Sequence, residues 1–149
     1  MEIHPLIVHF PIVCLILAAI FDWVGRIPSY SDATRTGFIL LLIGAVSTIP
    51  AAYTGEAAGE IAQSIPGIQN DLSDHQDAST FTLWSAILLG IARIHLVVRK
   101  QYAGGRRLAH TIVLTVCAGL VIWSAFTGGR LVQTHGAGTV GAQTSPTQN

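Results

Sequence analysis

The sequence is poor in charged residues. Lysine, arginine, aspartate and glutamate make up 11% of the 149 residues, and the formal net charge is zero. Soluble domains carry about 25% charged residues, whereas half of this chain is hydrophobic. Such a composition is typical of a membrane protein, and its length fits a single domain. A neutral chain is not expected to bind nucleic acid.

Cysteine and the common catalytic motifs are also scarce. Cys14 and Cys117 both lie in apolar runs and belong to no CxxC or CxxCH motif. This excludes covalent c-type haem attachment and indicates that both cysteines are core residues. The sequence has no Ser-His-Asp, P-loop or HExxH pattern, so no hydrolase or nucleotide chemistry is expected.

Long apolar runs, in contrast, are abundant. Four of them approach the roughly 20 residues that a membrane-spanning helix needs. They predict an all-α fold, a transmembrane four-helix bundle in residues 1–140 with a polar tail in residues 141–149. The first run has no basic segment before it and no A-x-A cleavage site, so it is expected to be a retained helix. The predicted helices cover approximately residues 4–25, 37–53, 75–98 and 107–128.

The positive charges are unevenly shared between the two sides of this predicted bundle. Four spans place both termini on one side, together with the loop 54–77, and we call this side the terminal end. The opposite side, with the loops 25–36 and 99–107, is the basic end. Seven of the eight lysines and arginines lie at or near the basic end: Arg26, Arg35, Arg93, Arg99, Lys100, Arg106 and Arg107.

This distribution predicts the orientation of the chain. Positively charged loops stay in the cytoplasm, so the basic end is expected to be cytoplasmic and the terminal end, with both termini, periplasmic. The expected location is the inner membrane of a bacterial cell, with several spans in the lipid bilayer. Glu56 and Glu60 would then face the periplasm.

The histidines gather at the terminal end. Of six in the chain, four fall there: His4 and His9 on the first predicted helix, His75 at the start of the third, and His135 just past the end of the fourth. Imidazoles on facing helices, with small residues near them, are typical of axial ligands to b-type haem. His4 and His9 are separated by about 7.5 Å of rise and about 140° of rotation, so they are not expected to bind the same iron. One or two haems are therefore possible.

Three further residues have two interpretations each. Arg130 is the only cation predicted at the terminal end, where it would pair with a haem propionate or with a nearby glutamate. His95 and His110 flank the basic turn and would ligate a second haem there or lie at the lipid interface with neighbouring arginines. We favour the interface for both. Any single histidine near an interface can also be a simple amphipathic anchor.

Several motifs together resemble a known family. HPLIVHFPI, TGEAAGE, DHQDAS and TGGRLVQTHGAGTV are similar to motifs of a bacterial family of four-helix membrane proteins, domain-of-unknown-function family 2231. The resemblance covers His4 to about Val140, and the family's histidine positions match His4, His9, His75 and His135. Gln133 departs from the pattern, which often has an aromatic residue there. The resemblance implies a membrane protein and points to haem or electron-transfer roles for some members.

The leading hypothesis is a membrane b-type cytochrome with bis-histidine haem. It would transfer electrons at the periplasmic side, with a periplasmic c-type cytochrome or other subunits of a membrane redox complex as partner. One alternative is a zinc or copper site built from three or four imidazoles. Another is an accessory subunit of a larger respiratory or photosynthetic complex. In each case an electron-transfer protein or complex subunit is expected rather than a stand-alone enzyme.

Overall fold

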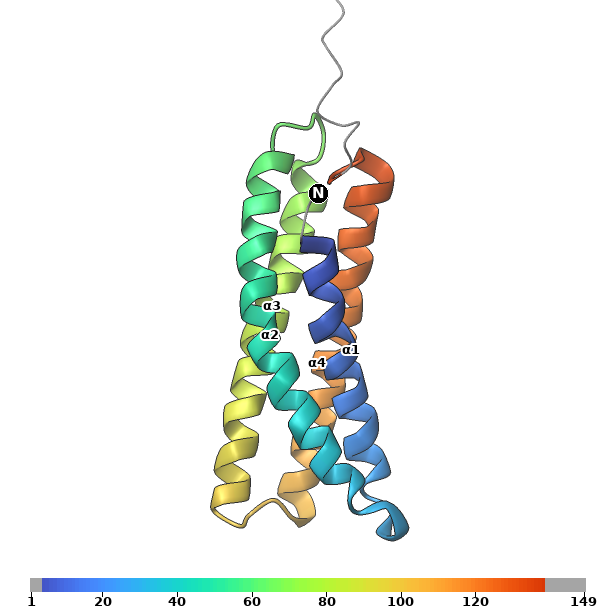
Figure 1. The fold of residues 1–149 in the computed structure, drawn as a ribbon, viewed down its shortest axis with the longest axis vertical. Coiled ribbons are helices and arrows are strands. Elements are labelled where there is room, and N and C mark those ends of the chain that lie inside the picture. Colours follow the sequence, from blue (N-terminus) through green and yellow to red (C-terminus); the bar gives the residue numbers. More distant parts are fainter. Residues whose placement is uncertain (1–3, 139–149) are drawn as a thin grey trace, which may run out of the picture.

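The computed structural model describes residues 4–138. The described chain is all-helical, and its four long helices are each long and apolar enough to cross a membrane. Both described ends and the α2–α3 connection lie at one end of the bundle, as the predicted topology requires (Figure 1). The predicted tail, residues 141–149, lies outside the described residues. The elements are α1 (His4–Val24), a short 3-10 helix η1 (Pro28–Tyr30), α2 (Ala33–Ala62), α3 (Gln69–Val98) and α4 (Gly104–His135).

Three of the helices extend beyond the apolar runs from which they were predicted. Helix α2 continues to Ala62, α3 begins at Gln69, and α4 continues to His135. Hydropathy marks only the part of a helix that crosses hydrocarbon, while backbone hydrogen bonding continues through polar residues outside it. Helix α4 ends where Gly136 adopts a left-handed conformation, with φ of 66°, as is common at helix C-termini.

The four helices form a ring in which α1 contacts α2, α2 contacts α3, α3 contacts α4 and α4 contacts α1. Helices α1 and α3 are therefore diagonally opposite. The α1–α2 contact is close because glycines of α2 face α1. A Cβ atom at Gly37 would lie 3.0 Å from the carbonyl oxygen of Ala18, and one at Gly44 would lie 3.0 Å from the side chain of Leu15. Small residues of this kind let membrane helices approach closely.

A substitution at Gly37 should test this close contact. Gly37→Ala should lower the free energy of unfolding by about 1–3 kcal/mol. The new methyl group would meet backbone atoms of α1, which cannot relieve the contact by a rotamer change as a side chain can. Reversible unfolding in detergent micelles measures the change. Gly119→Ala is the matched control, since a Cβ atom at Gly119 meets nothing within 4 Å and alanine favours the helix by up to about 1 kcal/mol. Equal losses in both variants would contradict the close α1–α2 contact.

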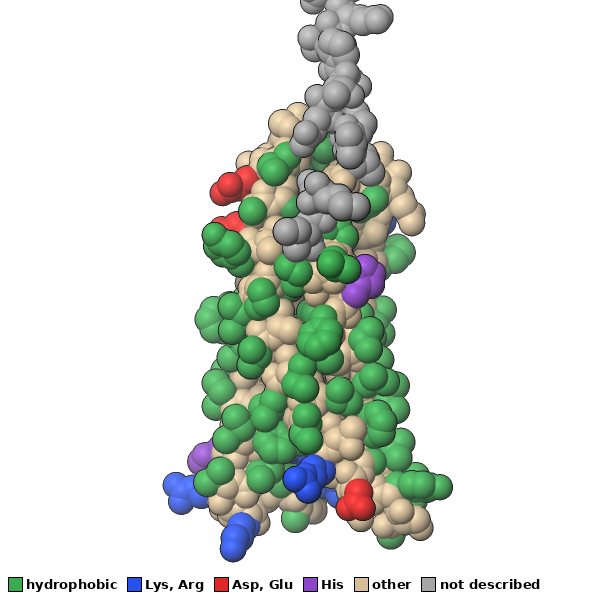
Figure 2. All heavy atoms as spheres, in the orientation of Figure 1, with side chains coloured by type: hydrophobic (Ala, Val, Ile, Leu, Met, Phe, Trp, Pro, Cys, Tyr) green, Lys and Arg blue, Asp and Glu red, His purple; other side chains and the backbone are tan. Residues whose placement is uncertain are grey.

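The outer surface of the bundle is apolar on every helix. Phe10, Val46, Leu88 and Val116, one from each helix, are all more than half exposed. Figure 2 shows hydrophobic side chains over the middle of the visible face, with lysine and arginine gathered at the basic end. A water-soluble protein rarely exposes an apolar surface of this extent. The apolar outer surface of the four helices is therefore the surface that faces lipid.

The buried apolar core is divided into two parts. The larger part fills the middle of the bundle and includes Leu15, Leu41 and Leu114, while the smaller part lies at the terminal end. Between the two parts lies a layer with polar side chains from all four helices, which we call the polar layer. It is formed by His4, Thr54, His75, Ser79, Ser124 and Thr127.

Candidate functional site

His75 is held in the polar layer by helix α4. Its Nδ1 atom lies 3.1 Å from the carbonyl oxygen of Ser124 and 3.1 Å from Oγ1 of Thr127. A carbonyl oxygen only accepts hydrogen bonds, so Nδ1 carries the proton. Thr127 donates its own hydroxyl proton to a carbonyl of α4 and can accept from His75. In the neutral ring the lone pair is therefore on Nε2.

His4 is held in the same way by helix α2. Its Nδ1 atom lies 3.0 Å from Oγ1 of Thr54. That hydroxyl lies 2.9 Å from the carbonyl oxygen of Pro50 and 3.1 Å from that of Ala51, so it donates to the backbone and accepts from His4. Nδ1 again carries the proton, and Nε2 again carries the lone pair. Metal-binding histidines commonly have this arrangement, with one ring nitrogen fixed as a donor so that the other can coordinate.

Glycines make room for both rings. A Cβ atom at Gly55 would lie 2.9 Å from Cε1 of His4, and one at Gly128 would lie 2.9 Å from Cε1 of His75. Neither position could carry a side chain without displacing an imidazole. Two diagonally opposite helices therefore bring their imidazoles into one layer, each packed against a glycine of a neighbouring helix.

The other predicted terminal-end residues lie apart from this pair. His9 is exposed on the outer surface, and its Nδ1 donates to the carbonyl of Pro5 in its own helix. His135 and Arg130 both contact Asp71, with Nε2 of His135 2.9 Å from Oδ2 and Nη2 of Arg130 2.9 Å from Oδ1. These contacts tie the end of α4 to the first turn of α3. The acidic partner of Arg130 is Asp71, and neither Glu56 nor Glu60 takes that role.

Larger sets of metal-ligating side chains are not found in the described part of the chain. Within residues 4–138, no three histidine, cysteine, aspartate or glutamate side chains converge on a position that could hold a metal ion. The His4–His75 pair is a smaller donor set. Two imidazoles suit an iron whose other ligands come from a porphyrin.

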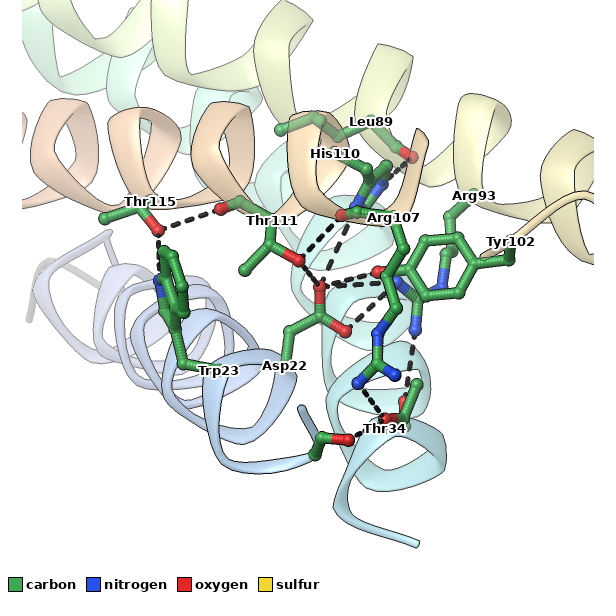
Figure 3. Close-up of polar contacts among 11 residues, drawn as sticks. Asp22, Trp23, Thr34, Leu89, Arg93, Tyr102, Arg107, His110, Thr111 and Thr115 are labelled. Carbon is green, nitrogen blue, oxygen red and sulfur yellow. Dashed lines mark hydrogen bonds and ion pairs between the residues drawn. The ribbon is translucent and has the colours of Figure 1, made fainter. Parts of the chain in front are cut away.

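A second polar cluster lies buried at the basic end. Asp22 and Arg93 are each 1% exposed, and Nη1 of Arg93 lies 3.1 Å from Oδ1 of Asp22. The hydroxyls of Tyr102 and Thr111 donate to Oδ2 of Asp22 over 2.7 and 2.8 Å. Figure 3 shows these side chains pointing toward one another from α1, α3, α4 and the α3–α4 connection. We call this group, with His110, the Asp22 cluster.

Helix α2 joins the Asp22 cluster through the arginines. Nη2 of Arg93 donates to the carbonyl oxygen of Thr34 over 3.2 Å, and Nη2 of Arg107 donates to the hydroxyl of Thr34 over 2.7 Å. The guanidinium of Arg93 stacks on the ring of Tyr102, 3.3 Å from its centroid, a cation–π contact that is strongest when desolvated. All four helices are thus held together by ionic and polar contacts around one buried carboxylate (Figure 3).

The sequence-based interpretation of His110 was wrong, while that of His95 agrees with the structure. His95 is exposed, but His110 is only 6% exposed and packs inside the bundle beside Asp22. A signal for this cluster was present in the sequence. Asp22 and Arg93 are charged residues within apolar runs, and an ionisable group at that depth requires a partner. Only the fold shows that the two belong together.

Comparison with known proteins gives a family. Neither the curated proteins nor the solved structures contain a match to this chain. The family model described as predicted membrane protein (DUF2231) matches residues 1–141, nearly the whole sequence. The motifs that contain His4, His9, His75 and His135 all lie within the matched region. The chain therefore belongs to the DUF2231 family of predicted membrane proteins.

Proposed function

We propose that this protein is a membrane b-type cytochrome, with haem bound at the terminal end through Nε2 of His4 and Nε2 of His75. The observation that carries the proposal is that the two imidazole rings have the same hydrogen bonding and the same packing. Each has Nδ1 fixed as a donor to an adjacent helix, its lone pair on Nε2, and a glycine against its edge. Haem supplies a one-electron redox centre whose potential is set by its axial ligands and surroundings.

The remaining residues of the polar layer support this role. Thr54 and Thr127 orient the two rings, and hydrogen bonding at Nδ1 makes Nε2 a stronger ligand. Gly55 and Gly128 lack a Cβ atom and so leave room for the two imidazoles. Ser79 and Ser124 are small, and their hydroxyl groups form a hydrogen bond with each other over 2.9 Å. Apolar clusters lie on either side of the layer.

The location and partner follow from the distribution of charge. With the basic end in the cytoplasm, the polar layer lies near the periplasmic surface. Acidic side chains are exposed around it, including Glu56, Glu60, Asp74 and Asp77. A negative rim of this kind favours encounter with a positively charged electron carrier, such as a periplasmic c-type cytochrome. The protein would act as an electron-transfer protein or a subunit of a redox complex.

The deciding experiment is a reduced-minus-oxidised visible spectrum of the purified full-length protein, with a pyridine haemochrome assay. A low-spin b-type spectrum with one haem per chain is expected, because His4 and His75 supply two axial ligands. Protein produced with ample haem but containing none would overturn the proposal. Bound zinc or copper would then support a metal site, and co-purifying large subunits would support an accessory role.

Substitution of the glycine beside His75 gives a sharper test. Gly128→Ala should reduce haem affinity about tenfold or more, because its Cβ atom would lie 2.9 Å from Cε1 of His75 and displace the ring. Haem titration into the apoprotein measures the change. Gly129→Ala is the matched control, since a Cβ atom there meets nothing within 4 Å. If both variants bind haem as the parent protein does, His75 is not an axial ligand.

A further inference from the structure

We infer that Nδ1 of His110 is a proton-binding site at the basic end, supplied from the aqueous phase through the hydroxyl of Tyr102 and the carboxylate of Asp22. This site is separate from the proposed haem site, which lies at the opposite end of the bundle. It is formed by a buried imidazole beside a buried carboxylate, in a part of the chain that the proposed electron transfer does not use.

The hydrogen bonds of His110 define where the proton would bind. Its Nε2 atom lies 3.3 Å from the carbonyl oxygen of Leu89, and a carbonyl only accepts, so Nε2 carries a hydrogen. Nδ1 is buried and has no hydrogen-bond partner within residues 4–138. It lies 3.9 Å from Oδ2 of Asp22. In the neutral ring two lone pairs face each other across this distance, and a proton on Nδ1 would turn the pair into an ion pair.

Charges of both signs surround Nδ1 of His110. Asp22 from α1 attracts a proton on His110, whereas Arg93 from α3 and Arg107 from α4 oppose it. Helix α2 contributes the carbonyl and hydroxyl of Thr34, which engage the two guanidinium groups. Arg93 already balances the charge of Asp22. A proton on Nδ1 is therefore attracted by one negative group and opposed by two positive groups.

Tyr102 provides the route for the proton. It lies in the connection between α3 and α4, it is only partly buried, and its hydroxyl donates to Oδ2 of Asp22 over 2.7 Å. The hydroxyl can pass its proton to Asp22 and take another from water, and Asp22 can pass the proton on to Nδ1 of His110. In each transfer one O–H bond breaks and one O–H or N–H bond forms, so one proton moves from the aqueous phase to His110, and a hydroxide ion or the base form of a buffer is left in the water.

A route from the other side of His110 is less suitable. A cleft of about 520 Å³ between α3 and α4 reaches His110 from the outer surface. Its walls are mainly apolar, with Leu88, Leu89 and Val113 among the lining residues, and Arg106 also lines it. Such apolar walls favour hydrocarbon over water, and a proton that entered the cleft would meet the positive charge of Arg106.

The primary test uses the full-length protein in lipid nanodiscs with ¹⁵N-labelled histidine. Solid-state NMR distinguishes a neutral ring protonated at Nε2 from an imidazolium. The His110 signal, assigned by its loss in His110→Gln, should convert between these forms as the pH changes between about 5 and 8. If His110 keeps one protonation state over this range, the inference is wrong.

Two variants test the roles of the neighbours. Asp22→Asn should weaken proton binding to His110 at least about tenfold, since a negative charge at this distance is lost. Asp32→Asn is the control, because Asp32 is exposed at the same end. Tyr102→Phe should slow protonation several-fold after a pH jump followed by rapid-mixing infrared spectroscopy. Unchanged binding in Asp22→Asn, or an unchanged rate in Tyr102→Phe, would overturn the corresponding part of the inference.

Discussion

Replacing Arg93 with methionine should lower the free energy of unfolding by about 3–5 kcal/mol. Arg93 neutralises Asp22, and both side chains are 1% exposed. Without the guanidinium, the carboxylate either remains charged in an apolar interior or takes up a proton, and both cost free energy. The contacts of Arg93 with Thr34 and with the ring of Tyr102 are lost at the same time. Reversible unfolding in detergent micelles, followed by circular dichroism, measures this loss.

Two further variants separate the ion pair from general effects of losing an arginine. Arg99→Met, at an exposed position of the same end, should change stability by less than about 0.5 kcal/mol. The double variant Asp22→Leu with Arg93→Met should recover most of the loss, because it leaves no unpaired charge in the interior. If Arg93→Met is as mild as Arg99→Met, Asp22 and Arg93 do not form a buried ion pair.

The second large effect is expected at the polar layer. His75→Ala should reduce bound haem at least about tenfold, because even loss of a group that only orients a metal-binding histidine costs about 10–100-fold in affinity. His4→Ala should have a similar effect, since the two imidazoles are the proposed pair of axial ligands. The haem-to-protein ratio from the pyridine haemochrome assay measures both losses.

The histidines outside the polar layer are the natural controls. His9→Ala and His95→Ala should keep the parent spectrum, because both side chains are exposed on the outer surface. Thr127→Val should give an intermediate result, since it removes one of two acceptors at Nδ1 of His75 and leaves the carbonyl of Ser124. Loss of haem in His9→Ala with retention in His75→Ala would show that the ligands are assigned to the wrong residues. Loss in His95→Ala would place the haem at the basic end.

The sequence alone determined the fold class and the sides of the bundle on which the histidines lie. Four apolar runs predict four spanning helices, because transfer of a side chain into hydrocarbon is a property of each residue and adds up along the chain. An even number of spans then places both described ends together, as Figure 1 shows. The same topology predicted that His4, His9, His75 and His135 lie at one end.

Only the tertiary structure decided which of these side chains face the interior. The spacing of His4 and His9 predicts that they point in different directions, but their neighbours decide which one points inward. Thr54 and Gly55 of α2 receive His4, while His9 faces outward. Likewise, His75 is positioned by Thr127 and Gly128 of α4, which are distant in sequence.

The Asp22 cluster shows the same division most clearly. The sequence shows Asp22 and Arg93 as two charges in separate apolar runs, and it led us to place His110 at the lipid interface. In the fold, Asp22, Arg93 and His110 meet in the interior. Their meeting depends on the rotation and axial register of helices α1, α3 and α4, which are set by close packing between helices. Hydropathy contains no term for rotation or register, so the sequence predicted the helices and the tertiary structure determined which residues come together.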